Sequence, residues 1–478
     1  MLNIRSIVTM LGLILSKLAV FMWIPIIYCF FTASEGLSRF FASFVITESV
    51  AFILTHSARP RHFSLSMRDM FILTSSVWIL GCLFGALPIW LLTSLDFTGA
   101  VFETMSGLTT MGASVIPDVE SVPRSVLLWR SILQWIGGIG FIIIAIAVLP
   151  AMNVGGMKLF RTEFSERTKD TPRTSTLAKN IVLAYMTITL LCVLSYRLTG
   201  MPVFDAINHA FTTVATGGFS TRNASITAFG PAAQWIAVVF MLLSGLPFIL
   251  YVRSFKSMSP ELLNDSQVRT FLRIFIAASV MLALWLILGN GLGVSDSIRI
   301  SALTVASIIT TTGYYTGDWW SYGPFAILII LLILPIGACS GSSSGGIKIF
   351  RLQLAYSIFR MECRPLIHPK SVIPQKYNGK PIDSEVVGSL VAYEFSFIAV
   401  MILSSAALCV MGVPLSESIT GTVSALANVG PGLGGSLGSG FYGGIPDAGR
   451  IILSADMMLG RLEFLTALVL LFPSFWKG

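Results

Sequence analysis

Charged residues are scarce in this chain: only 11% of its 478 residues are charged, whereas 54% are hydrophobic. A soluble domain carries about 25% charged residues, so the composition excludes an ordinary soluble protein. The six cysteines are scattered without a C-x-x-C pair, and the four histidines show no ligand spacing. The sequence therefore indicates neither a disulfide framework nor a structural metal site.

Long apolar runs are abundant instead. They cover residues 7–31, 71–92, 126–149, 181–196, 236–251 and 326–336, which is the length of a full or half membrane crossing. The first run is longer than the core of a signal peptide and lacks a small-residue cleavage pattern, so we expect it to be a transmembrane helix. These runs predict a polytopic membrane protein that lies in a lipid bilayer.

The net charge of +8 is unevenly distributed. Most of the 31 basic residues lie in four segments, 59–68, 158–179, 253–273 and 348–380, and the segments between them carry mainly acids. This asymmetry is the positive-inside pattern, which predicts cytoplasmic basic loops and cytoplasmic N- and C-termini. Nucleic-acid binding is the alternative explanation of the charge, but solvated loops explain it better, so we expect no nucleic-acid partner.

The basic segments divide the chain into five units, 1–56, 69–150, 177–255, 268–357 and 385–478. The first unit has the pattern of a plain helix pair. Each of the other four has the pattern of a helix, a polar re-entrant segment and a second helix, which makes ten transmembrane helices in all. The predicted fold class is an all-α polytopic membrane protein. In it, four tandem helix–pore loop–helix repeats surround a pseudo-fourfold pore.

Each repeat contains a short peptide with glycine after its polar helix. The peptides are Thr110-Met111-Gly112-Ala113, Ala215-Thr216-Gly217-Gly218, Thr311-Thr312-Gly313-Tyr314 and Asn428-Val429-Gly430-Pro431. Backbone carbonyls can surround a bare cation only where the chain adopts torsions that a Cβ forbids. One such peptide is more often a turn, but four in equivalent positions predict a cation filter. Its residues are Thr110, Met111, Gly112, Ala215, Thr216, Gly217, Thr311, Thr312, Gly313, Asn428, Val429 and Gly430.

An acidic residue lies near the start of each short helix, at Asp96, Asp205, Asp296 and Glu417. A carboxylate suits the positive N-terminal end of the helix dipole. The opposite, partly negative ends then lie at the glycine peptides. Four such ends at one point would favour a monovalent cation and disfavour anions.

Residues 335–346 interrupt the second helix of the third repeat with glycine and serine. Such a segment cannot form a stable lipid-facing helix, and broken helices tend to line permeation paths. A flexible cytoplasmic linker is the alternative. A phosphate-binding loop is excluded because Ile347 separates Gly346 from Lys348. The candidate gate residues are Gly337, Ala338, Cys339, Ser340, Gly341, Ser342, Ser343, Gly345 and Gly346.

Arg461 lies within the apolar run 451–471, where a charge is costly unless it faces water or a partner. Facing the pore below the filter, Arg461 would be an electrostatic barrier to cations and part of the gate. The alternative is an ion pair with Glu463 or Asp456 that only fixes the helix. Arg130 is near the outer end of its helix, where it can snorkel or pair with an acid such as Glu103.

Several ordered motifs resemble the TrkH family of potassium-uptake proteins. They are Met105-Ser106-Gly107-Leu108-Thr109-Thr110, Leu133-Gln134-Trp135-Ile136-Gly137-Gly138, Gly217-Gly218-Phe219-Ser220-Thr221, Cys339-Ser340-Gly341-Ser342, Asn428-Val429-Gly430-Pro431-Gly432-Leu433-Gly434 and Gly460-Arg461-Leu462-Glu463. The resemblance covers nearly the whole chain, including the N-terminal helix pair. The chain departs mildly from the commonest pattern at Met111, at Ala215 before Thr216, and in its serine-rich loop.

The resemblance implies a bacterial inner-membrane subunit that takes up K⁺, which is transported and bound in the filter without an organic cofactor. It also implies an intramembrane gating loop, matching residues 336–346, and a gate arginine, matching Arg461. Family members are homodimers with a cytosolic nucleotide-binding regulatory partner of the TrkA type. By position only, the basic loops 155–180 and 253–273 would be the docking surfaces.

Two other functions remain as alternatives. A secondary transporter would couple K⁺ entry to H⁺ or Na⁺, which usually needs a titratable or ion-binding group at membrane depth, and candidates for it are few. A membrane-embedded enzyme would need a catalytic constellation, and none stands out in the sequence. We therefore expect a channel-like K⁺ pathway and no enzymatic activity.

Overall fold

Helices dominate the structure. The computed structural model describes residues 2–58, 65–147, 174–257, 261–317, 319–367, 376–377, 380–381, 384–434 and 437–477. Within these ranges the only strands are β1 (Lys376–Tyr377) and β2 (Lys380–Pro381), which form a two-residue antiparallel pair. The protein is therefore all-α, as the sequence predicts.

Seven helices of the described ranges are long and apolar enough to cross a membrane. An eighth crossing is present if α10 (Pro231–Ser244) and α11 (Phe248–Ser257), which meet at 86°, count as one span. The predicted number of ten is not confirmed. The remaining candidates, α15 (Pro324–Ile333) and α19 (Asp447–Arg461), are short, and α19 includes charged residues at Asp447, Arg450, Asp456 and Arg461.

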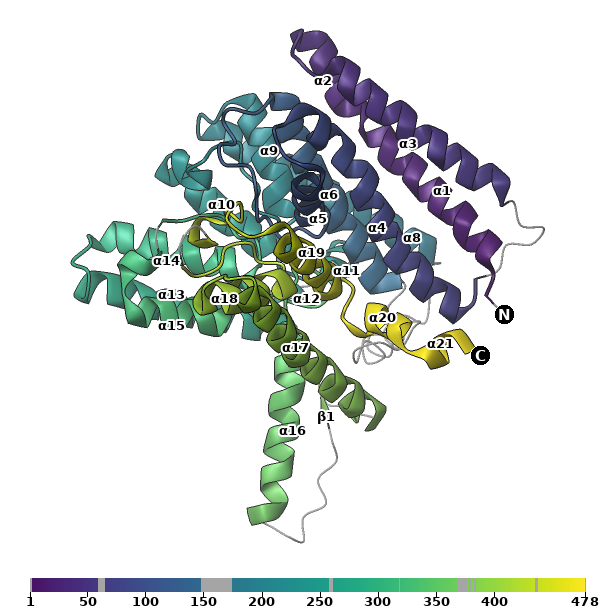
Figure 1. Ribbon diagram of the computed structural model, residues 1–478. Helices are drawn as coiled ribbons and strands as arrows, with labels where there is room; N and C mark the ends of the chain where they lie inside the picture. Colours follow the sequence, from purple (N-terminus) through teal and green to yellow (C-terminus); the bar gives the residue numbers. More distant parts are fainter. Residues whose placement is uncertain are drawn as a thin grey trace.

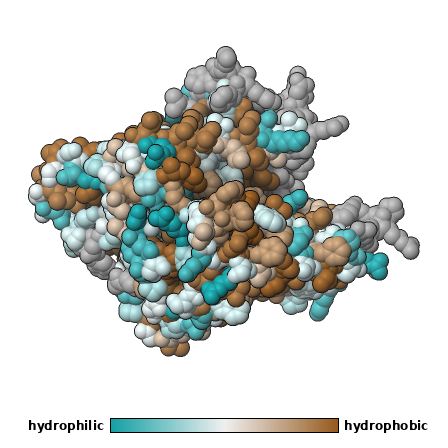
Figure 2. All heavy atoms as spheres, turned by 90° about the horizontal axis from the view of Figure 1, so that it is seen from above, coloured by the Kyte–Doolittle hydropathy of each residue, from teal (hydrophilic) through white to brown (hydrophobic). Residues whose placement is uncertain are grey.

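Large hydrophobic side chains are exposed on many of the long helices, and Figure 2 shows the broad hydrophobic areas that result. They belong mainly to leucine, isoleucine, valine and phenylalanine, for example Leu183, Leu190, Val280, Leu284 and Phe395. Soluble monomers rarely expose contiguous apolar areas of this kind. The protein is a multi-pass membrane protein.

The N-terminal helices lie along one side of the molecule (Figure 1). They are α1 (Ile4–Phe21), α2 (Trp23–Thr32) and α3 (Leu37–Ser57). A Cβ on Gly12 would overlap Thr55 and the backbone of Ala51, so glycine allows α1 and α3 to approach closely. α1 and α2 together form one span of 29 residues, and this span and α3 make a helix pair that packs against α4 (Met67–Leu92).

Four short helices each lie between two other helices in chain order (Figure 1). They are α5 (Phe97–Leu108), α9 (Val203–Val214), α14 (Val294–Ile309) and α18 (Leu415–Ala427), with 12, 12, 16 and 13 residues. At 1.5 Å per residue these helices are roughly 18–24 Å long, shorter than the ~30 Å hydrocarbon core. In chain order, α5 lies between α4 and α6 (Arg124–Ala147), and α9 lies between α8 (Thr174–Leu198) and α10. Likewise, α14 lies between α13 (Ser266–Leu288) and α15, and α18 lies between α17 (Ser384–Val410) and α19.

The acidic residues occupy the first turn of these short helices, as expected. Asp96 is the N-cap of α5, and its side chain accepts a hydrogen bond from the Gly99 N–H at 3.1 Å. Asp205, Asp296 and Glu417 are each the third residue of their helix. The carboxylates are therefore at the positive ends of the helix dipoles, and the negative ends carry the glycine peptides.

Both ends of the described chain lie beside the start of α4. The Asn3 N–H donates to the Asp69 carboxylate at 3.0 Å, and the Phe475 ring lies 6.3 Å from the Phe71 ring. The other α-helices of the described ranges are α12 (Glu261–Asn264), α16 (Ile349–Ile367), α20 (Leu465–Leu468) and α21 (Pro473–Lys477). The two termini therefore lie on the same side of the molecule (Figure 1).

Candidate cation filter and intramembrane loop

The four half-length helices end in turns of the same shape. A non-glycine residue adopts a positive φ in each turn: Thr110 (58°), Thr216 (51°), Thr311 (57°) and Asn428 (54°). The next residue donates its N–H to the carbonyl five positions earlier, at 2.8 to 2.9 Å in all four turns. Two positions after the threonine or asparagine, a glycine has a positive φ in each turn: Gly112, Gly218, Gly313 and Gly430.

This register corrects the second peptide by one residue. Thr216 is equivalent to Thr110 and Thr311, so Gly218, rather than Gly217, is equivalent to the other three glycines. Ala215 is the C-cap of α9 and precedes the turn. Two adjacent glycines hide the register in the sequence, because either one can adopt a positive φ.

The four turns meet in a closed ring. A Cβ on Gly112 would overlap the carbonyl oxygen of Gly217, and a Cβ on Gly218 would overlap that of Thr312. The same relation joins Gly313 to Val429, and Gly430 back to Met111. Each glycine therefore leaves room for a carbonyl of the next turn. The ring consists of four backbone oxygens, a ligand type that can replace the hydration shell of a cation.

Side chains behind the ring fix two of its turns. The Gln134 side-chain amide donates to the Gly217 carbonyl at 2.5 Å and accepts from the Phe219 N–H at 3.1 Å. The Tyr442 hydroxyl donates to the Gly430 carbonyl at 2.8 Å. Neither positioning residue is among those that the sequence predicts for the filter. Gln134 belongs to a recognisable motif, but neither residue has a sequence signal for its role.

A polar cavity of about 300 Å³ adjoins the ring. It is lined by glycines of three turns, Gly112, Gly218 and Gly313, and by Gly440 beyond the fourth. Arg130 also lines it and is held by a buried ion pair with Glu103 at 2.6 Å, which confirms the pairing that the sequence suggested. This cavity is suited to hydrated ions because its lining is polar.

The segment 337–346 is buried beside two of the turns. The Thr216 hydroxyl donates to the Ser343 hydroxyl at 3.2 Å. The Thr311 hydroxyl contacts Ser344 at 3.3 Å and accepts from the Gly345 N–H at 2.8 Å. Because the segment is buried, the alternative of a flexible cytoplasmic linker is wrong.

The break between α10 and α11 holds the same segment from another side. The Cys339 N–H donates to the Gly245 carbonyl at 3.1 Å, and the Phe248 N–H donates to the Gly341 carbonyl at 3.0 Å. The bend of 86° at this break exposes backbone groups that a continuous helix would satisfy internally. The break between α10 and α11 and the segment 337–346 therefore satisfy each other's backbone groups by hydrogen bonds.

Arg461 is buried and bonded to the segment. Its guanidinium donates to the Ser343 carbonyl at 2.9 Å and to the Gly137 carbonyl at 3.4 Å, and it lies 4.1 Å from the centre of the Phe141 ring. In the part of the chain that the structure describes, no ion pair joins Arg461 to Glu463 or Asp456.

Glu463 has other partners. It pairs with Lys348 at 3.2 Å and with Arg351, just after the loop in sequence. The ion-pair alternative for Arg461 is therefore wrong among the described residues. The loop is therefore tied to Arg461 at the end of α19 through Ser343, and the residues that follow the loop are tied to Glu463 just after α19.

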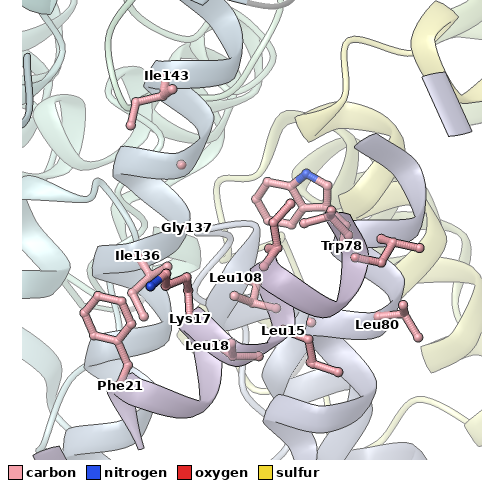
Figure 3. A pocket seen from close by; sticks show the side chains of 15 residues that line it. Leu15, Lys17, Leu18, Phe21, Trp78, Leu80, Leu108, Ile136, Gly137 and Ile143 are labelled. Carbon is pink, nitrogen blue, oxygen red and sulfur yellow. The ribbon is translucent and has the colours of Figure 1, made fainter. Parts of the chain in front are cut away.

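A second cavity, of about 310 Å³, lies between α1, α4 and α6 (Figure 3). Apolar side chains such as Leu15, Trp78 and Leu108 line it, and Lys17 is the one charged residue of its lining. The cavity reaches Gly137 behind the first turn. Its apolar walls make it unsuited to a bare cation, so it is not part of the candidate pathway.

Comparison with known proteins identifies relatives along nearly the full chain. The family described as TrkH, cation transport protein, matches residues 36–477. The Trk system potassium uptake protein TrkI of Halomonas elongata is 37% identical over 465 residues, covering 96% of this chain and 94% of the relative. The Trk system potassium uptake protein TrkH of Escherichia coli K12 is 33% identical, covering 99% of this chain and 100% of the relative.

The arrangement of helices is also similar to that of a solved relative. The crystal structure of the potassium transporter TrkH from Vibrio parahaemolyticus superposes with a TM-score of 0.91 at 30% identity. The match covers 99% of this chain and 100% of the other.

Proposed function

Because this chain belongs to the TrkH family of cation transport proteins, we propose that it takes up K⁺ across the bacterial inner membrane. The family consists of transporters rather than enzymes. In the proposal, K⁺ loses its hydration shell to backbone oxygens of the four turns and crosses one pore in each subunit. K⁺ is then the cargo, and the proposal needs no organic cofactor.

One observation carries the proposal: the closed ring in which each turn lies against a carbonyl of the next. A filter for bare cations needs oxygen ligands on all sides, and four turns of one chain supply them here. The half-length helices add to this because their C-terminal ends, which are partly negative, lie at the ring. This electrostatic field favours cations over anions.

The loop 337–346 and Arg461 form the gate in this proposal. Ser343 and Ser344 contact the hydroxyls of Thr216 and Thr311, which supports a gate because the loop lies against two turns of the ring. Arg461 holds the Ser343 carbonyl and adds a positive charge to the same place. A cation cannot pass until these contacts break, so opening requires displacement of the loop.

The assembly and orientation follow from the same proposal. The five units of the sequence become an N-terminal helix pair and four repeats, with the basic loops and both termini in the cytoplasm. We expect a homodimer with a cytosolic nucleotide-binding regulatory partner of the TrkA type. Of the two candidate docking loops, most of 155–180 lies outside the described residues, and so does the repeat boundary at residue 150.

Flux in liposomes tests the proposal. Purified protein is reconstituted with an outward K⁺ gradient, and uptake of radioactive Rb⁺ is followed with equal pH and equal Na⁺ on both sides. We expect Rb⁺ uptake well above that of empty liposomes, and strong inhibition by external K⁺ but weak inhibition by external Na⁺. Equal inhibition by the two ions would refute a K⁺-selective filter.

The same assay separates a channel from a coupled transporter. Uptake that requires an added H⁺ or Na⁺ gradient would favour the coupled alternative and exclude free permeation. Growth of a K⁺-uptake-deficient bacterium at limiting K⁺, with and without a regulatory subunit, then tests whether the partner opens the gate in cells.

A further inference from the structure

Asp456 is a buried carboxyl group in the middle of α19 that the proposed pathway does not use. The residue is 2% exposed. One of its carboxyl oxygens accepts a hydrogen bond from the Ser404 hydroxyl of α17 at 2.9 Å. The other, Oδ2, is buried and has no hydrogen-bond partner in the described part of the chain.

No cation balances this carboxyl group. The helix α19 packs against α5, α17 and α18. Glu103 of α5 is paired with Arg130, and on α19 itself Arg450 lies near Asp447 and Asp96. The cations of these helices are Arg450 and Arg461, and among the described residues neither forms an ion pair with Asp456. The other acids of these helices with described side chains are Glu103, Glu394, Glu417 and Asp447.

An ionised carboxylate in such a place is strongly unfavourable, because it has lost its water and gained a single hydroxyl donor. The neutral acid avoids this penalty and keeps its hydrogen bond to Ser404. The arrangement in which loop 337–346 is buried therefore holds a proton on Asp456. An arrangement that admits water beside α19 would release it.

Short contacts connect α19, the helix that carries Asp456, to the ring and to the loop. The Asn428 side chain of the fourth turn donates to the Met457 carbonyl at 3.0 Å, and the Cα of Gly460 lies against the Leu426 carbonyl. Arg461 donates to the Ser343 carbonyl. A shift of α19 that hydrates Asp456 would therefore disturb both the ring and the gate.

We propose that Asp456 is a proton-binding site inside the membrane whose protonation stabilises the closed arrangement of the loop. This inference rests on the proposed K⁺ pathway, because the pathway supplies the flux that the proton would control. Since the closed state binds the extra proton, a rise in pH favours the open state, by at most about tenfold per pH unit for one proton. Flux therefore rises with pH.

Asp456→Asn tests this, because asparagine has nearly the same shape and cannot ionise. Asp447→Asn in the first turn of the same helix is the matched control, since the Asp447 side chain is 64% exposed. Rb⁺ flux is measured in liposomes at several pH values, equal on both sides. We expect flux to rise with pH in the wild type and the control, and to stay low and flat in D456N.

A wild-type pH dependence in D456N would overturn the inference. Ser404→Ala is a second variant: it removes the hydrogen bond that the neutral acid keeps in the closed arrangement, so the flux curve should move to lower pH. An unmoved curve also counts against the proposal. Because a missing flux would instead contradict the K⁺ pathway, infrared difference spectra provide an independent readout. Among the C=O bands that acidification produces, one should be present in the wild type and in D447N and missing from D456N, and the lack of any such difference between the wild type and D456N would refute the site.

Discussion

Gly218 provides the sharpest test of the ring, because the structure and the sequence motif assign the second turn differently. We consider the substitution Gly218→Ala. The residue has φ +77°, and a Cβ there would overlap the Thr312 carbonyl oxygen, one of the four in the ring. Gly412 is the matched control: it has φ +88°, and a Cβ there would have no neighbour within 4 Å.

Both substitutions carry the cost of a left-handed backbone conformation, but only Gly218→Ala also carries a cost of overpacking. A left-handed conformation costs a residue with a Cβ about 1–2 kcal/mol, and this applies to both sites. Overpacking adds about 1–3 kcal/mol, but only at Gly218, where the Thr312 carbonyl must move. We therefore expect the free energy of unfolding to fall by about 1–2 kcal/mol in Gly412→Ala and by about 2–5 kcal/mol in Gly218→Ala.

The displaced carbonyl should also change ion selection. A change of about 1.4 kcal/mol in the relative free energies of K⁺ and Na⁺ is a tenfold change in selectivity. We expect the K⁺/Na⁺ flux ratio in liposomes to fall at least tenfold in Gly218→Ala and to stay at the wild-type value in Gly412→Ala. Titration with a denaturing detergent measures the free energy of unfolding of both variants. If Gly218→Ala folds and retains wild-type selectivity, Thr312 and Gly218 do not form part of the filter.

Three further substitutions test the gate and the groups behind the ring. Arg461→Ala should raise basal Rb⁺ flux roughly tenfold or more, because a charge-assisted hydrogen bond to Ser343 is worth about 1.5–3 kcal/mol; an unchanged basal flux in folded protein contradicts the barrier. Gln134→Leu removes both hydrogen bonds to the second turn and should lower the K⁺/Na⁺ flux ratio, whereas normal selectivity would show that this turn needs no support. Glu103→Gln leaves the buried Arg130 without its charged partner, so the free energy of unfolding in detergent titration should fall by about 3–5 kcal/mol. A fall below about 1 kcal/mol would mean that water replaces the ion pair.

The sequence predicts much of the candidate site because local rules govern it. The acid at the start of a short helix and the glycine after its end mark three of the four turns in the correct register, at Gly112, Gly313 and Gly430. In the second turn Gly217 and Gly218 are adjacent. Torsional preference alone cannot separate them, and only the left-handed conformation of Thr216 sets the register.

The number of membrane crossings shows a second limit. Ten spans are predicted from alternating polar and apolar segments, whereas the described helices include seven or eight that meet the length and polarity of a span. The prediction of ten is not confirmed, because α15 ends near Pro335 and α19 carries charges along its length, so neither meets the length and polarity of a span. Such helices can be stable only where other parts of the protein cover them.

Arg461 illustrates what tertiary contacts add. The sequence marks it as a charge inside an apolar run, but it leaves two interpretations open, a barrier below the filter or an ion pair. Among the described residues the structure excludes the ion pair, because Glu463 is occupied by Lys348 and Arg351 while Arg461 donates to Ser343. The barrier stays a proposal.

By itself, the sequence determined the membrane class, the interrupted helix at 335–346 and the places where the backbone must leave the helix, since each depends on hydrophobicity or torsional preference within a few residues. Only the tertiary structure decided which carbonyl lies against which glycine and what holds the loop. The Arg461 contacts join residues 118 and 324 positions apart. Distances of this kind leave no trace in local composition, because they arise only when the four units close on one another.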